Sequence, residues 1–171
     1  MQLHEVILAG RRVRTFSVLC LALLPTPIAA QATPAAPAFH AAGAFAGLSV
    51  PDLEASTRWY EEKLGMRVIF RPPPYEGTSV VVLEGGGLTV ELLHNPAAVP
   101  LRTAAPSISH TTLVHGPFKV GIVVNDYDQA LARLRERGVT VVAGPFPARD
   151  AVPANFMIRD NAGNLIQLFG R

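Results

Sequence analysis

Two side chains of opposite charge lie in apolar segments of this 171-residue chain. Glu91 lies in LTVELLH (residues 88–94), and Lys119 lies in FKVGIVV (residues 118–124). The chain has only two lysines against thirteen arginines, so a lysine inside an apolar run is unusual. Burial can tune a carboxylate into a general base, and an ammonium group can bind a carboxylate or stabilise an oxyanion. Glu91 and Lys119 are therefore the candidate catalytic residues; the alternative is an ion pair that only fills a cavity.

Other catalytic patterns are weak in this sequence. The run Gly85-Gly86-Gly87 precedes no predicted helix, so it is not typical of a phosphate-binding loop. No serine lies in a recognisable nucleophile elbow, so the sequence gives no sign of a Ser/His/Asp triad. The three histidines of the central region, His94, His110 and His115, lie in or near a Ser/Thr-rich linker, where solvated side chains are expected.

An internal repeat positions the candidate residues. Residues 47–54 (GLSVPDLE) match residues 121–128 (GIVVNDYD) at an offset of 74. Each copy predicts a strand, a helix capped by Asp52 or Asp126, and a glycine stop at Gly65 or Gly138. Three predicted strands then follow each helix, over residues 66–71, 78–83 and 88–94 and over residues 140–143, 155–159 and 165–169. The sequence predicts an α+β fold of two tandem βαβββ repeats, whose sheets pair into a curved, partly closed cavity.

Strand alternation assigns the two faces of each sheet. Apolar residues at every second position, such as Leu48 and Ile122, predict the face covered by the helix. The other positions then face the cavity: Phe45, Gly47, Ser49, Thr89, Glu91, Leu93, Lys119, Gly121, Val123, Leu165, Gln167 and Phe169.

Three segments resemble the vicinal oxygen chelate superfamily, which includes glyoxalase I, bleomycin-binding proteins, fosfomycin-resistance proteins and extradiol dioxygenases. The segments are LSVPDLEASTRWYEEKLGMRV, KVGIVVNDYDQALARLRERGV and MIRDNAGNLIQLFG. The resemblance covers roughly residues 43–171. It implies the predicted fold, and it does not select one activity because this fold carries many chemistries.

The resemblance also places the metal ligands of relatives. Members that use a metal have a histidine seven residues before each capping aspartate and an acidic residue in the last strand of each repeat. Those positions here hold Phe45, Glu91, Lys119 and Gln167. A phenylalanine cannot bind a metal and a lysine opposes one, so we expect no metal and no other cofactor. If the repeats pair as in relatives, Glu91 and Lys119 approach each other.

The N-terminus is typical of a secretory signal peptide. Arg11, Arg12 and Arg14 precede the apolar run of residues 15–24, and cleavage is expected after Ala30 or Ala32. The run is short for a membrane span, although an uncleaved anchor is the alternative. We expect a signal peptide over residues 1–32, a flexible linker over 33–43 and one domain over 44–171, with repeats at 44–94 and 118–170. Localisation is then periplasmic or secreted, with no stable membrane span after cleavage.

Charge and resemblance together define the expected function. Residues 33–171 hold 12 Lys and Arg and 12 Asp and Glu, so the exported part is neutral and unlike a nucleic-acid-binding protein. We expect a protein that binds a small organic molecule in a metal-free cavity, with Phe45, Glu91, Lys119 and Gln167 as ligand-binding residues. The alternative is a metal-independent lyase or isomerase of the glyoxalase type that uses Glu91 and Lys119. Relatives commonly form dimers, so the resemblance also implies a homodimer.

Overall fold

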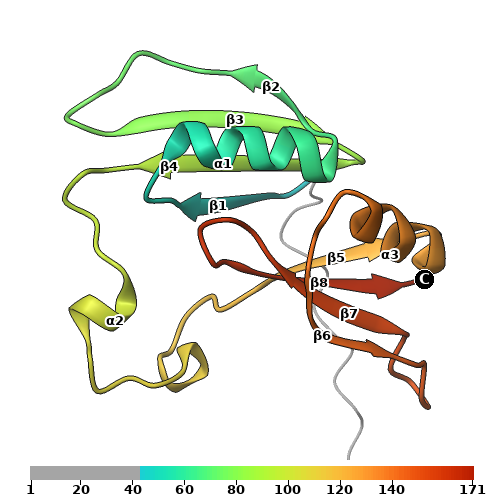
Figure 1. Cartoon of the computed structure of the whole chain (residues 1–171). Coiled ribbons are helices and arrows are strands. Elements are labelled where there is room, and N and C mark those ends of the chain that lie inside the picture. The colour runs from blue at the N-terminus through green and yellow to red at the C-terminus, as the bar shows by residue number, and fades with distance from the viewer. Residues whose placement is uncertain (1–42) are drawn as a thin grey trace, which may run out of the picture. The chain divides into compact units, whose positions relative to one another are not determined.

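Two four-stranded sheets, each with a helix against one face, make up the described chain (Figure 1). A computed structural model describes residues 43–171. The first module contains β1 (Phe45–Ser49), α1 (Leu53–Trp59), the π-helical turn η1 (Tyr60–Leu64), β2 (Arg67–Phe70), β3 (Ser79–Gly85) and β4 (Leu88–His94). The second contains β5 (Val120–Val124), α3 (Tyr127–Glu136), β6 (Val141–Phe146), β7 (Asn155–Arg159) and β8 (Leu165–Gly170).

The two sheets have the same topology. Their strand orders are β1-β4-β3-β2 and β5-β8-β7-β6, with β1 parallel to β4 and β5 parallel to β8. Gly47 pairs with Glu91 in the first sheet, and Gly121 pairs with Gln167 in the second. The predicted α+β fold of two paired βαβββ modules is therefore confirmed. Within residues 43–171, β1 and β5 are edge strands without hydrogen bonds to each other, so the two sheets do not close.

Both main helices begin and end at the predicted residues. The side chain of Asp52 accepts a hydrogen bond from the Ala55 N–H at 2.9 Å, and that of Asp126 accepts one from the Gln129 N–H at 3.0 Å. The left-handed residue after each helix is a glycine, Gly65 with φ 70° and Gly138 with φ 73°. The hydrogen bonds of Asp52 and Asp126 satisfy backbone N–H groups that the N-terminus of a helix leaves free.

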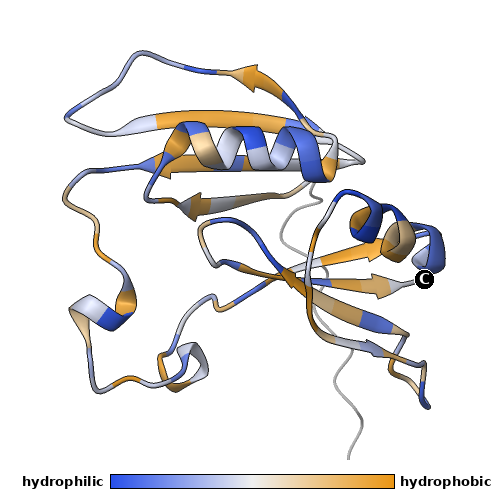
Figure 2. Ribbon diagram, in the orientation of Figure 1, coloured by the Kyte–Doolittle hydropathy of each residue, from blue (hydrophilic) through white to orange (hydrophobic). Residues whose placement is uncertain are grey.

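The core lies between each sheet and its helix. Val81, Leu83 and Leu92 of the first sheet and Phe156 and Ile158 of the second are fully buried. Figure 2 shows largely hydrophobic strands, while hydrophilic residues gather on α3 and on the connecting turns. Burial alternates along β1 and β5 as predicted, since Leu48 and Ile122 pack against the core while Gly47 and Gly121 are exposed.

Two sets of hydrogen bonds join the modules. The Tyr60 hydroxyl, 1% exposed, donates to the Asp160 carboxylate at 3.1 Å. The Lys63 ammonium donates to the Arg137 carbonyl at 2.6 Å, and the Arg137 guanidinium donates to the Lys63 carbonyl at 3.0 Å. Lys63 and Arg137 occupy equivalent positions of the repeat, so each basic side chain binds the C-terminal end of the other module's helix. A helix C-terminus attracts positive charge, which favours this exchange.

The structure differs from the sequence expectations in two segments. The predicted strand over residues 140–143 extends in β6 to Phe146, which pairs with Asn155 of β7. The central linker contains two short helices, α2 (Leu101–Ala104) and η2 (Thr111–Leu113), and the His110 side chain caps the second. The predicted signal peptide and most of the predicted linker lie outside the described residues. Within 43–171, no helix has the length and hydrophobicity needed to cross a membrane.

Candidate functional site

The four predicted site residues occupy equivalent places in the two modules. Phe45 opens β1, and Lys119 stands directly before β5. Glu91 and Gln167 lie in the last strands, β4 and β8, each opposite a glycine of the neighbouring strand. The structure therefore places these residues by the same symmetry that the repeat predicted.

Glu91 lies on an open part of the first sheet. It is half-buried, between Gly47 of β1 and Val82 of β3 in the strand register. One carboxylate oxygen is 3.8 Å from the point where a Cβ on Gly47 would lie. The glycine thus leaves room for the carboxylate to lie over β1.

A series of hydrogen bonds through side-chain amides connects Lys119 to the second sheet. Its ammonium group donates to the Gln167 side-chain oxygen at 2.5 Å. Gln167, 5% exposed, donates in turn to the Asn155 side-chain oxygen at 2.8 Å, and Asn155 donates to the Pro153 carbonyl at 3.0 Å. Each amide is oriented by its neighbour, so the oxygen of Gln167 is held toward Lys119.

The expected approach of Glu91 to Lys119 does not take the form of an ion pair. No ion pair joins the two side chains in the described part of the protein, whose ion pairs are Arg67 with Glu84 and Arg71 with Glu54. The physical reason is that the first and second sheets stay separate, and Lys119 bonds to a neutral amide of its own module. A neutral partner leaves the positive charge of Lys119 uncompensated.

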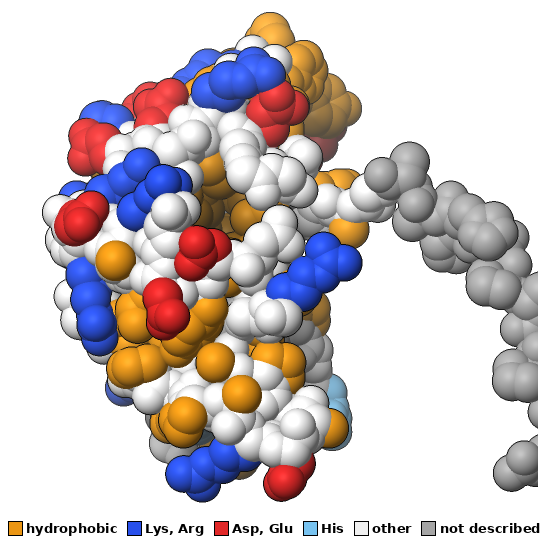
Figure 3. Space-filling view, turned by 90° about the vertical axis from the view of Figure 1, so that its right-hand side faces the viewer, with side chains coloured by type: hydrophobic (Ala, Val, Ile, Leu, Met, Phe, Trp, Pro, Cys, Tyr) orange, Lys and Arg blue, Asp and Glu red, His pale blue; other side chains and the backbone are white. Residues whose placement is uncertain are grey.

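A groove of about 610 Å³ runs beside the free edge of β1. All five residues of β1 line it on one side, and residues 117–120 line it from the second module together with part of the β7–β8 turn. Two of the four predicted residues, Phe45 and Lys119, contribute to its wall, whereas Glu91 and Gln167 do not. Figure 3 shows one face of the molecule, where charged side chains of both signs alternate with hydrophobic patches.

The groove carries positive charge. Lys119 and Arg159 line it, and no acidic side chain is among its lining residues. The Arg159 guanidinium donates to the Gly163 carbonyl at 2.7 Å, and within residues 43–171 it joins no ion pair. Ser49, Thr111 and Asn164 add polar side chains to the same wall. This set of donors suits a ligand with a negatively charged or hydrogen-bond-accepting group.

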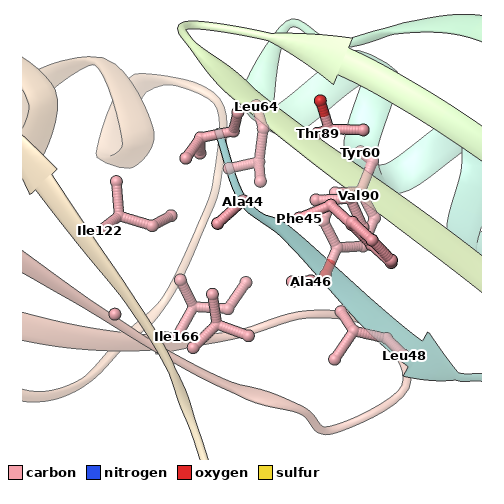
Figure 4. A pocket seen from close by; sticks show the side chains of 13 residues that line it. Ala44, Phe45, Ala46, Leu48, Tyr60, Leu64, Thr89, Val90, Ile122 and Ile166 are labelled. Atoms are coloured by element: carbon pink, nitrogen blue, oxygen red, sulfur yellow. The ribbon is translucent and has the colours of Figure 1, made fainter. Parts of the chain in front are cut away.

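A smaller apolar cavity of about 160 Å³ adjoins the groove. Figure 4 shows its walls, with Ala46 and Leu48 of β1 on one side and Ile122 and Ile166 of the second module on the other. Tyr60 reaches it from η1, and its hydroxyl is already bonded to Asp160. Burial and the nearby Asp160 carboxylate raise the pKa of Tyr60 well above its usual range, so the phenol stays protonated.

The chain belongs to the glyoxalase/bleomycin resistance protein/dioxygenase superfamily. The family model with this description matches residues 39–168, which is most of the sequence. A search of curated proteins gives no match.

Solved structures support the same fold. A glyoxylase/bleomycin resistance protein/dioxygenase domain from Frankia sp. EAN1pec superposes with a TM-score of 0.60 at 20% identity, covering 77% of this chain and 93% of that one. TnmS3, an antibiotic binding protein from Streptomyces sp. CB03234, gives 0.51 at 24% identity and covers 77% and 98%. A glyoxalase I mutant (V278E) from Zea mays gives 0.54 at 19% identity and covers 73% and 43%. At these identities the likeness concerns the fold.

The side chains at the family's metal positions do not fit a metal. Among Phe45, Glu91, Lys119 and Gln167, only Glu91 offers a strong ligand, and the Gln167 oxygen already accepts a bond from Lys119. The histidines do not rebuild a site, since His94 contacts the Val50 carbonyl at 3.1 Å and His110 contacts Thr112 at 2.8 Å. Residues 43–171 contain no group of three His, Cys, Asp or Glu side chains arranged to hold a metal ion.

Sequence reasoning missed Arg159 and Asn155. Both lie on β7 and alternate with the buried residues Phe156 and Ile158. Applying strand alternation to β7, and not only to the first and last strands of each module, predicts that they share a face with Gln167. The Tyr60–Asp160 bond had no such signal, because it joins two elements 100 residues apart.

Proposed function

We propose that this protein binds a small organic molecule in the groove beside β1. The observation that carries the proposal is the groove itself, about 610 Å³ in volume and lined by apolar side chains together with a few polar and cationic ones. Volumes of this size and mixed linings are typical of small-molecule sites. The likeness to TnmS3, an antibiotic binding protein, adds support.

The arrangement of charges favours binding over catalysis. A general base must lie within reach of its substrate, and an acid–base pair must converge on the reacting atoms. Lys119 lines the groove, whereas Glu91 does not, and the two form no ion pair in the described chain. A lyase or isomerase that uses both residues is the second candidate, favoured by the half-buried carboxylate of Glu91 on a largely apolar strand. It predicts a turnover that Glu91→Gln abolishes while binding is retained.

The binding protein is proposed to act outside the cytoplasm as a homodimer. Export rests on the basic and apolar pattern of residues 11–32, which lie outside the described residues. The homodimer is proposed because relatives commonly form dimers. Mass spectrometry of the protein recovered from the periplasm tests the first, with a mature chain beginning at Gln31 or Thr33 expected; light scattering tests the second.

A thermal-shift screen with the full chain tests the binding function. The compounds are bleomycin and anionic, neutral and cationic phenylalkyl molecules, and hits are followed by calorimetry. At least one compound is expected to raise the melting temperature and to bind with a stoichiometry near one per chain. Absence of any binder among the three charge classes and bleomycin would contradict the proposal.

A substitution that fills the groove tests its role, and the same substitution outside the groove is the matched control. The Cβ of Gly47→Phe would lie 3.8 Å from Glu91, an ordinary contact, so the backbone tolerates the substitution while the ring occupies the groove. Gly43→Phe adds the same ring where nothing lies within 4 Å of the new Cβ. Binding should be lost in the first variant and kept in the second.

A further inference from the structure

The groove and the apolar cavity adjoin one another along β1. Phe45, Ala46 and Leu48 of β1 and Val120 of β5 line both spaces. β1 and β5 are edge strands with no hydrogen bonds between them, so no backbone ladder closes the gap between the two strands. A molecule lying in the groove can therefore extend an apolar part between the two strands.

The two spaces differ sharply in chemistry. The groove wall holds the charges of Lys119 and Arg159, while the Glu91 carboxylate lies 3.8 Å from the Cβ position of the lining residue Gly47. The cavity wall is almost entirely hydrocarbon, and of its two hydroxyl-bearing residues, Tyr60 and Thr89, the first already donates to Asp160 (Figure 4). A polar ligand group would have few partners in the cavity, and burying it there would be costly.

The size of the cavity limits what can enter it. Its volume of about 160 Å³ is close to that of an engineered apolar cavity of about 150 Å³ that stays dry and binds benzene. One aromatic ring or a short alkyl chain therefore fits, and a larger polycyclic group does not.

We infer that the ligand is an amphipathic anion. Its carboxylate or similar oxyanion binds at Lys119 and Arg159, and its single ring or short alkyl chain enters the cavity between β1 and β5. Gln167 and Asn155 act as positioning residues, since their oriented amides hold the lysine ammonium at the groove. This inference rests on the proposed function and adds the chemical class of the ligand.

Calorimetry on the full chain with straight-chain carboxylates from butanoate to decanoate, below their micelle concentrations, tests the inference. Primary amides of the same chains are the neutral controls. Affinity for the carboxylates should rise about fourfold with each added methylene and level off once the cavity is full. Lys119→Gln and Arg159→Gln should each weaken carboxylate binding by about tenfold or more and leave amide binding unchanged.

Two substitutions in β5 test whether the alkyl chain of the ligand enters the cavity. Ile122→Phe places a larger side chain in the cavity and should bring the levelling-off to a shorter carboxylate. Val123→Phe adds the same ring at the next residue, which is 68% exposed and lines neither space, and should leave the series unchanged. Thermal unfolding of each variant checks that the fold is retained.

The outcomes separate this inference from the proposed function. Equal binding of carboxylates and amides, stronger binding of cationic compounds, or affinity independent of chain length would overturn the amphipathic anion while leaving a small-molecule site in place. If neither the carboxylate series nor any compound of the broader screen binds, the proposed function fails as well.

Discussion

At the residue scale, the contact with the greatest structural consequence is the bond between Tyr60 and Asp160. Asp160 is 5% exposed and accepts from the backbone N–H groups of Ala162 and Asn164, from the Asn164 side chain and from Tyr60. Burying a carboxylate is costly unless its oxygens accept hydrogen bonds, and these donors supply them. Tyr60 is the donor that comes from the other module, so the bond couples the two halves.

Removing this donor should destabilise the fold. Tyr60→Phe is expected to lower the free energy of unfolding by about 1.5–3 kcal/mol, the range for a hydrogen bond to a charged group. Tyr127→Phe is the control, because the Tyr127 hydroxyl donates at 3.3 Å to a neutral carbonyl within the second module. Urea unfolding measures both, and equal losses in the two variants would contradict the importance assigned to Asp160.

The same tyrosine predicts a loss of stability at high pH. The unfolded chain releases the phenolic proton near pH 10, whereas burial and Asp160 raise the pKa in the folded state. The folded protein therefore holds the proton where the unfolded chain does not, and stability falls as pH rises above about 10. Unfolding curves between pH 8 and 11 should show a shallower loss in Tyr60→Phe; identical pH profiles would speak against the raised pKa.

The residue types at the family's metal positions predict that metal ions do not change the stability of the protein. Nickel, zinc, manganese and iron(II) should leave the melting temperature of the wild-type chain unchanged, and Glu91→Gln should behave like wild type. Thermal shifts together with elemental analysis of the full chain check this. A large stabilising shift that Glu91→Gln abolishes would mean that Glu91 completes a ligand set.

At the element scale, both helices depend on their N-caps. Asp52→Ala and Asp126→Ala should each cost about 1 kcal/mol of folding free energy, because each removes an acceptor of a free helical N–H. Asp128→Ala is the matched control, since Asp128 lies in the first turn of α3 without capping it and should cost only a few tenths of a kcal/mol. Urea unfolding is the measurement, and a cost for Asp128→Ala equal to that of Asp126→Ala would refute the capping role.

Edge strands explain why the proposed site lies between the modules. β1 and β5 each pair on one side only, with β4 and β8, and keep their other backbone edge available. Both adjoining spaces are built along these edges. A ligand that bridges them would cover edges that otherwise invite pairing with other chains.

At the scale of the whole molecule, the sequence predicted each module better than the junction between them. Local signals, such as the Asp52 cap, the Gly138 stop and strand alternation, depend on neighbouring residues and were sufficient for the two βαβββ units. The junction depends on contacts between distant residues, such as Tyr60 with Asp160 and Lys63 with Arg137. No spacing rule specifies such contacts, and the expected meeting of Glu91 and Lys119 gives no ion pair in the described residues.

At this scale, we propose that a small anionic molecule binds between the modules, beside β1 and Lys119. Nuclear magnetic resonance of the isotope-labelled full chain, titrated with hexanoate, tests it most directly. We expect backbone amide shifts to change along β1 and around Phe118–Val120, and Lys119→Gln to suppress these changes. Shifts confined to the strands around Glu91 and Val82, or no shifts at hexanoate concentrations up to the millimolar range, would contradict it.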